Sequence, residues 1–211
     1  MTTFSAIKNI IFDLGAVIIP IDFERTFQAF ATLSDLSKEE IKMRYQSSPI
    51  FLDFEKGLIG NFAFLKELRA LLNCKASITD EDLTTAWNTL LLPIPKERID
   101  RIQSLSHTYR LFLLSNTNPI HIAEVNRILF CRTAVPVLED LFEKTWYSYD
   151  LGLIKPHTAI YDAVLKQKNL DASETVFLDD NADNIAGAAS VGIHAMLVTE
   201  KDGMVELLKE A

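Results

Sequence analysis

The sequence has few of the residues that build disulfide-linked or metal–thiolate proteins. Its 211 residues include only two cysteines, Cys74 and Cys131, which lie far apart and form no Cys-x-x-Cys pair. Structural disulfides are therefore not expected, and a reducing compartment is the simplest setting for the chain. The sequence predicts a cytoplasmic protein that folds without disulfide bonds.

Long apolar runs and an excess of positive charge are missing as well. No segment approaches the roughly 20 apolar residues that a membrane-spanning helix needs. The apolar stretch near the N-terminus is interrupted by Asp13 and lacks the order of regions that marks a signal peptide. The formal net charge is −8, from 21 basic and 29 acidic residues. Neither a nucleic acid nor an anionic membrane is expected as a partner.

Glycine and histidine are also scarce, which argues against a nucleotide-binding loop and against a metal site built from histidines. The chain has seven glycines and no glycine-rich loop of the kind that binds a nucleotide cofactor. Its four histidines are scattered, without metal-ligand spacing: His107, His121, His157 and His194. We expect these histidines to be surface or packing residues.

Hydrophobic residues make up 48 % of the chain, enough for a large buried core. Short, continuous apolar runs at residues 10–14, 111–115, 176–178 and 194–198 predict buried parallel strands, with a weaker fifth strand near 144–149. Helical patterns lie between them at residues 120–129, 159–168 and 184–191. This alternation predicts an α/β fold with a doubly wound parallel sheet.

The segment from residue 20 to residue 92 has a different pattern. Apolar residues recur every three or four positions over 23–33, 62–72 and 83–92, and Ser37–Glu40 and Thr79–Asp82 have the spacing of helix start signals. We expect a helical cap at 20–92, inserted into an α/β core formed by residues 1–19 and 93–211. Such a cap would cover the carboxyl ends of the strands.

Carboxylates follow two of the predicted strands. Asp13 comes at the end of the first strand, and Asp179 and Asp180 follow the third apolar run. A lone aspartate at such a place is usually a turn or cap residue. However, the carboxyl ends of parallel strands meet at one sheet edge, where three carboxylates repel each other unless a cation lies between them. The pattern favours a hard divalent ion, Mg²⁺.

Neutral donors and a lysine accompany these acids. Ser115 and Asn116 end another strand, and Lys155 precedes Pro156 in a turn before a helix. Taken singly, the first pair is typical of a helix cap and the lysine of a protein surface. Together with the acids they indicate a phosphoryl-binding site, in which metal and lysine neutralise the group and the donors orient it.

These segments resemble the motifs of the haloacid dehalogenase superfamily of phosphotransferases. The matching segments are DLGAV from residue 13, LSN from 114, KP from 155, and FLDD from 177 with Asn184 beyond it. Residues 13–23, together with FEKGLI at 54–59, are similar to the bacterial branch typified by α-D-glucose-1-phosphate phosphatase.

The resemblance implies a role for each matching residue. Asp13 would attack phosphorus and form an aspartyl phosphate. Mg²⁺ would be held by the Asp13 carboxylate, the Gly15 carbonyl and Asp180, with Asp179 binding through water or completing the shell. The phosphate would be bound by Ser115 or the adjacent Asn116 amide and by Lys155, and Asn184 would brace the acidic loop.

Gly15 departs from the family pattern, which commonly has a second aspartate there as the general acid and base. Such assistance is typically worth about 10²–10⁴-fold in rate. Three outcomes are open: a substrate with a readily expelled leaving group, such as a sugar 1-phosphate; a substitute acid, such as Asp22; or phosphate binding with slow turnover. Asp22 is equally suited to cap the helix at Phe23. The similar phosphatase branch also carries glycine here, so we expect activity.

We therefore expect a Mg²⁺-dependent phosphatase of small phosphorylated metabolites, sugar phosphates above all, acting as a monomer or homodimer. Within the cap, Arg44, Glu55 and Lys56 are candidates for substrate contact. Two alternatives stay open: a weakly active or inactive binding or scaffold protein on the same fold, and a metal-independent 2-haloacid dehalogenase.

Overall fold

A five-stranded parallel sheet forms the centre of the computed structural model, which describes residues 4–199, 203–209 and 211. The strands are β1 (Asn9–Phe12), β2 (Arg110–Ser115), β3 (Lys144–Tyr147), β4 (Thr175–Asp179) and β5 (His194–Leu197). Their order is β3-β2-β1-β4-β5, and every neighbouring pair is parallel. The predicted α/β fold with a doubly wound sheet is confirmed.

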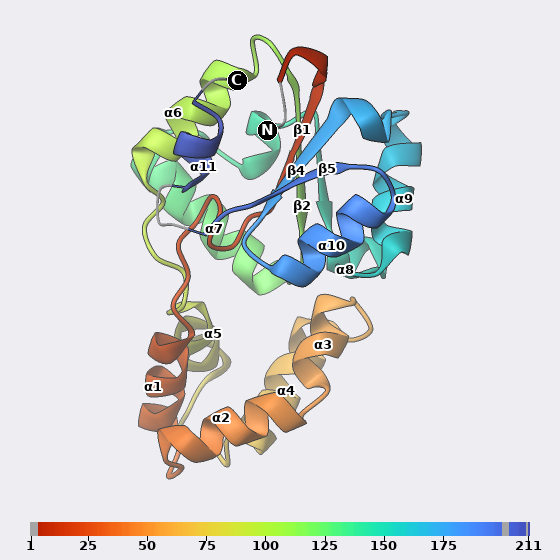
Figure 1. The fold of residues 1–211 in the computed structure, drawn as a ribbon. Helices are drawn as coiled ribbons and strands as arrows, with labels where there is room; N and C mark the ends of the chain where they lie inside the picture. The colour runs from red at the N-terminus through yellow and green to blue at the C-terminus, as the bar shows by residue number, and fades with distance from the viewer. Residues whose placement is uncertain (1–3, 200–202, 210) are drawn as a thin grey trace.

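Helices cover both faces of this sheet (Figure 1). They are α6 (Lys96–Leu105), α7 (Pro119–Thr133), α8 (Ser148–Leu151), α9 (Thr158–Lys168), α10 (Ala182–Ser190) and α11 (Gly203–Leu207), with 3₁₀ turns at Phe4–Ala6, Leu138–Leu141 and Ala172–Glu174. Ile10 and Phe12 of β1 belong to the hydrophobic cluster that includes α6 and α7, whereas Ile11 belongs to the cluster with α9. Because both faces of the inner strands β2, β1 and β4 are buried, these strands are continuously apolar rather than alternating. The prediction of a buried strand at 194–198 is wrong in its burial, because β5 lies at the edge of the sheet and its residues are exposed or only partly buried.

Five helices form a separate lobe beyond the carboxyl ends of the strands (Figure 1). They are α1 (Phe23–Leu33), α2 (Lys38–Ser47), α3 (Ile50–Glu55), α4 (Asn61–Leu71) and α5 (Asp80–Asn88). Phe30, Phe54, Phe64 and Trp87 are central to its own hydrophobic cluster. The start signals predicted at Ser37 and Thr79 are confirmed, because both residues form complete capping boxes.

Two chain segments connect this lobe to the sheet, and they lie side by side. Asp22 N donates to Leu90 O at 2.9 Å, and Leu92 N donates to Pro20 O at 3.0 Å. The helix predicted over 83–92 is therefore wrong at its end: α5 stops at Asn88, because the following residues pair with the outgoing segment. No helix in the described part of the chain has the length and apolar character needed to cross a membrane.

Candidate active site

Three carboxylates meet at the carboxyl edge of the sheet. Asp13 N donates to Leu178 O at 2.8 Å, which extends the pairing of β1 with β4 by one residue and holds Asp13 beside Asp179. One carboxylate oxygen each from Asp13, Asp179 and Asp180 lies within 4.8 Å of the others. Asp13 and Asp179 are buried and Asp180 is exposed. The structure thus brings together the acids that the strand ends predicted.

Lys155 lies between two of these acids. Its Nζ donates to Asp13 Oδ1 at 2.7 Å and to Asp179 Oδ2 at 2.6 Å, and its side chain is 1 % exposed. The side chain of Asn116 fixes the lysine backbone, since Asn116 Nδ2 donates to Lys155 O at 3.0 Å and Lys155 N donates to Asn116 Oδ1 at 2.9 Å. The side-chain amide of Asn116 therefore positions the lysine, a role that the sequence did not predict.

Asp179 is held by several donors. Asn184 Nδ2 donates to both of its oxygens, at 3.0 and 3.1 Å, and Asn181 N donates to Oδ1 at 2.8 Å. The brace that the resemblance implied for Asn184 is thus present as a contact. Because Lys155 also donates to Asp179, this carboxylate is better placed to fix the site than to coordinate an ion directly.

Burial and mutual repulsion govern the charges at this edge. Burial raises the pKa of Asp13, and the charge of Asp179 adds to this, while Lys155 opposes it. Burial also raises the pKa of Asp180, again with a contribution from Asp179. Burial disfavours the charged form of Lys155, but Asp13 and Asp179 outweigh it and raise the lysine pKa. Three carboxylates face one ammonium group, and a divalent cation with oxygen ligands fits the excess of two negative charges.

Gly15 and Ser115 lie at the same edge. The Gly15 carbonyl accepts a hydrogen bond from Val17 N at 2.6 Å, and a carbonyl oxygen has a second lone pair for an ion. A Cβ at Gly15 would lie 3.4 Å from Ile21 Cδ1, so the neighbouring space is apolar. Ser115 is buried at the end of β2, and both residues line one cavity.

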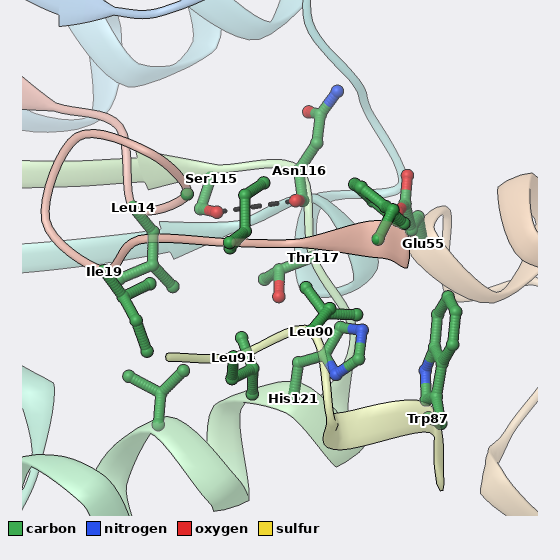
Figure 2. Close-up of a pocket in the computed structure, with 14 residues that line it drawn as sticks. Leu14, Ile19, Glu55, Trp87, Leu90, Leu91, Ser115, Asn116, Thr117 and His121 are labelled. Carbon is green, nitrogen blue, oxygen red and sulfur yellow. Dashed lines mark hydrogen bonds between the residues drawn. The ribbon is translucent and has the colours of Figure 1, made fainter. Parts of the chain in front are cut away.

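This cavity has a volume of about 80 Å³. Figure 2 shows Ser115 on one side of it, with Glu55 and Trp87 on the side of the helical lobe. Most of the remaining lining is apolar: Leu14, Ile19, Ile21, Phe23, Leu90, Leu91 and Val125. Asp13, Asp179, Asp180 and Lys155 do not line this small, largely apolar cavity, which adjoins the acidic edge through Gly15 and Ser115.

His121 also lines this cavity, although the sequence indicated only a packing or surface residue. Its Nδ1 lies 2.9 Å from Asn88 Oδ1, and its ring stacks on Trp87 with 4.6 Å between centroids. Burial lowers the pKa of His121 to about 3, so the ring is neutral. The available signal was its place in the first turn of α7, just beyond Ser115.

The cap candidates and Asp22 have different surroundings. Glu55 lines the cavity, whereas Lys56 and Arg44 do not, and Arg44 donates to Leu71 O at 2.5 Å within the lobe. Asp22 caps α1, because Glu24 N donates to its Oδ1 at 3.0 Å, and it is not among the lining residues. The capping function expected as the alternative for Asp22 is the one found.

Comparison of the chain with models of known protein families identifies its family. The haloacid dehalogenase-like hydrolase family matches residues 7–192. The chain belongs to this family. The resemblance to the haloacid dehalogenase superfamily is thereby confirmed, and this hydrolase is an enzyme of that superfamily.

One curated protein and two crystal structures of one enzyme, all from the same bacterium, are similar to this chain. This hydrolase is 35 % identical over 179 residues to D-ribitol-5-phosphate phosphatase of Bacteroides thetaiotaomicron, a match that covers 85 % of each chain. It superposes on the crystal structure of a haloacid dehalogenase family enzyme from that organism with a TM-score of 0.89 and 34 % identity, covering 96 % of this chain and 98 % of the other. A complex of that enzyme with magnesium and inorganic phosphate gives a TM-score of 0.80 and 35 % identity, with 90 % and 93 % covered.

Proposed function

We propose that this hydrolase is a Mg²⁺-dependent phosphatase of small phosphorylated metabolites, with sugar phosphates and related polyol phosphates as the substrate class. The observation that carries the proposal is the cluster of Asp13, Asp179 and Asp180 around the buried ammonium of Lys155. A similar protein acts on D-ribitol 5-phosphate, and an enzyme of the same fold was crystallised with magnesium and phosphate.

Asp13, Asp180 and the carbonyl of Gly15 are the groups proposed to hold the ion, with Asp179 fixing the cluster from behind. When bound, Mg²⁺ supplies positive charge that offsets both the carboxylates and the phosphoryl oxygens. The donor set consists of oxygen atoms only, as this ion prefers.

The proposed chemistry proceeds in two displacements. A carboxylate oxygen of Asp13 attacks phosphorus as the bond to the leaving oxygen breaks, which gives an aspartyl phosphate. Water then attacks phosphorus and releases Asp13 and inorganic phosphate. Lys155 and Ser115 stabilise the charge on the phosphoryl oxygens, and the side chain of Asn116 holds Lys155 in place.

We also propose that residues 20–92 act as a cap over a core of residues 1–19 and 93–211. Two features support this division: the hydrophobic cluster of the lobe comes almost entirely from its own helices, with Ile120 of α7 as the buried core residue in it, and two paired chain segments connect the lobe to the sheet. Substrate selection is then a property of the cap side of the cavity, where Glu55 and Trp87 lie.

The two alternatives fit the site less well. A metal-independent dehalogenase acts on a carboxylate substrate, which the excess negative charge of the three carboxylates over the one ammonium would repel. An inactive scaffold needs no paired arrangement of Asp13 with Lys155, yet both are buried and in contact.

Substrate screening tests the proposal. Purified protein is assayed on sugar phosphates, polyol phosphates and p-nitrophenyl phosphate, with Mg²⁺ and after treatment with EDTA. We expect hydrolysis that requires the metal and that Asp13→Asn abolishes, because an amide cannot attack phosphorus. Phosphate hydrolysis that survives EDTA would contradict the metal requirement, metal-independent release of halide from a 2-haloacid would support the dehalogenase, and normal Mg²⁺ affinity without hydrolysis of any substrate would support the scaffold.

A further inference from the structure

Hydrolysis of an alkyl phosphate is faster when an acid protonates the leaving oxygen, and the residues of the acidic edge do not supply such an acid. An alkoxide is a poor leaving group, and a proton delivered to it is typically worth about 10²–10⁴-fold in rate. Asp13 is the proposed nucleophile, Lys155 is bound between two carboxylates, and Gly15 has no side chain. A proton donor has to come from another part of the molecule.

The direction of attack indicates where this donor must lie. Attacking and leaving oxygens are roughly in line across phosphorus. Asp13 lies at the sheet edge and the helical lobe faces this edge (Figure 1), so the leaving oxygen points toward the lobe. The donor must therefore be a lobe residue that reaches the cavity beside Gly15.

Glu55 meets this requirement. Of the fourteen described residues that line the cavity, it is the one carboxylic acid, and it reaches the cavity from the end of α3 (Figure 2). Gly15 and Ser115 line the same cavity from the core. A leaving group in this space would have Gly15 and Ser115 on its core side and Glu55 on its lobe side.

The surroundings of Glu55 keep it able to exchange a proton near neutral pH. Burial raises its pKa to about 7, an effect that the ammonium of Lys155 partly opposes. Tyr45 of α2 is the other titratable neighbour, and its own pKa is raised to about 12 by burial and by the charge of Glu55, so it stays neutral. Both forms of Glu55 are therefore populated near pH 7.

A close backbone contact holds Glu55 at the core. Two residues further on, Gly57 adopts φ +68°, and a Cβ there would overlap the carbonyl oxygen of Tyr149 in α8. Leu58 N donates to Asp53 O at 2.9 Å, which closes the turn. The turn after α3 thus fits directly against the core and delivers Glu55 to the cavity.

We propose that Glu55 is the general acid and base of this hydrolase, an assignment that rests on the phosphatase function proposed above. In the first displacement, an oxygen of Asp13 bonds to phosphorus, the bond from phosphorus to the leaving oxygen breaks, and the Glu55 proton passes to that oxygen. In the second, the Glu55 carboxylate takes a proton from water as the water oxygen bonds to phosphorus and the Asp13 carboxylate departs. Glu55 is again protonated and the cycle closes.

The experiment compares Glu55→Gln with wild type on two substrates. One is a polyol phosphate, whose alkoxide needs a proton, and the other is p-nitrophenyl phosphate, whose phenolate leaves without one. The ratio kcat/KM reports steps up to release of the first product. We expect kcat/KM of Glu55→Gln to fall roughly 10²–10⁴-fold on the polyol phosphate and to change less than about threefold on p-nitrophenyl phosphate.

A burst measurement provides a second readout. Because water attack also loses its base, Glu55→Gln should release about one equivalent of p-nitrophenolate quickly and then turn over slowly. The matched control is Glu67→Gln on the exposed face of α4, which should behave as wild type on both substrates. Thermal unfolding of each variant checks that it is folded.

Three outcomes would overturn the assignment. Equal losses of kcat/KM on both substrates would show that Glu55 is a structural or binding residue. Wild-type values of kcat/KM on both substrates would show that Glu55 takes no part in the reaction. If wild-type protein hydrolyses neither substrate, the phosphatase function itself fails, and the assignment to Glu55 fails with it.

Discussion

Lys155 is the residue on which the charge balance of the site depends. Its ammonium is buried and contacts Asp13 and Asp179, two carboxylates that are themselves buried. Attraction in such a group offsets the loss of hydration only while every partner is present. The lysine therefore stabilises the folded site before any phosphate binds.

Replacing Lys155 by methionine should leave the buried carboxylates of Asp13 and Asp179 without their positively charged partner. We expect the free energy of unfolding in EDTA to fall by about 3–5 kcal/mol, the usual cost of breaking a buried ion pair. Urea denaturation followed by circular dichroism measures this change. Lys144→Met, at an exposed position of β3, is the control and should have little effect. Equal stability of the two variants would mean that Lys155 is not charged in the folded protein.

At the scale of an element, the turn after α3 is one place where a lobe helix contacts the core, another being α5 against α7. Gly57 lies against the backbone of Tyr149, where a side chain has no room. At Gly60, three residues later, a Cβ would have no neighbouring atom within 4 Å. The two glycines also differ in backbone conformation, with φ +68° at Gly57 and φ −90° at Gly60, so an alanine at Gly57 disturbs both the contact and a left-handed backbone.

Gly57→Ala should separate the turn from α8 and move Glu55 out of the cavity. Misplacement of a reacting group by about 1 Å can cost 10²-fold in rate, so we expect a loss of kcat/KM on alkyl phosphates of at least about tenfold. Gly60→Ala should retain activity. Steady-state kinetics of the two variants make the comparison, and equal activities would show that the contact with Tyr149 is dispensable.

The elements also show which features the sequence could predict. Apolar runs that end in Asp13, Ser115 and Asp179 predicted the common edge, because parallel strands place their carboxyl ends together. The bond from Lys155 to Asp13 spans 142 positions and could not be inferred from local pattern. Glu55 was only one of several cap candidates, because a polar helical residue has the same spacing whether it faces a cavity or solvent.

At the scale of the whole molecule, an ion at the acidic edge links two distant parts of the sequence. It would contact residues that follow β1 and β4, which are far apart in the chain. An ion that binds only the folded arrangement stabilises the entire protein by mass action. Metal binding is thus measurable without any substrate.

Magnesium should therefore raise the unfolding temperature of the wild-type protein. At a concentration 100 times Kd, we expect about 2.7 kcal/mol of stabilisation. Asp180→Asn should reduce this increase because it removes an exposed member of the cluster. Asp183→Asn, a nearby exposed acid outside the cluster, should retain it. Differential scanning calorimetry checks the result, and an equal increase in both variants would place the ion elsewhere.

The side-by-side passage of the two connecting segments, at residues 20–22 and 90–92, has a consequence for how the lobe can move. Both segments leave the sheet along one margin, and α3 lies toward the opposite one (Figure 1). The lobe is therefore attached to the core along one margin, and it contacts the core at the other margin through Gly57 and Tyr149. A rotation of the lobe about the margin of attachment would displace α3, which carries Glu55, farther than α5, which carries Trp87.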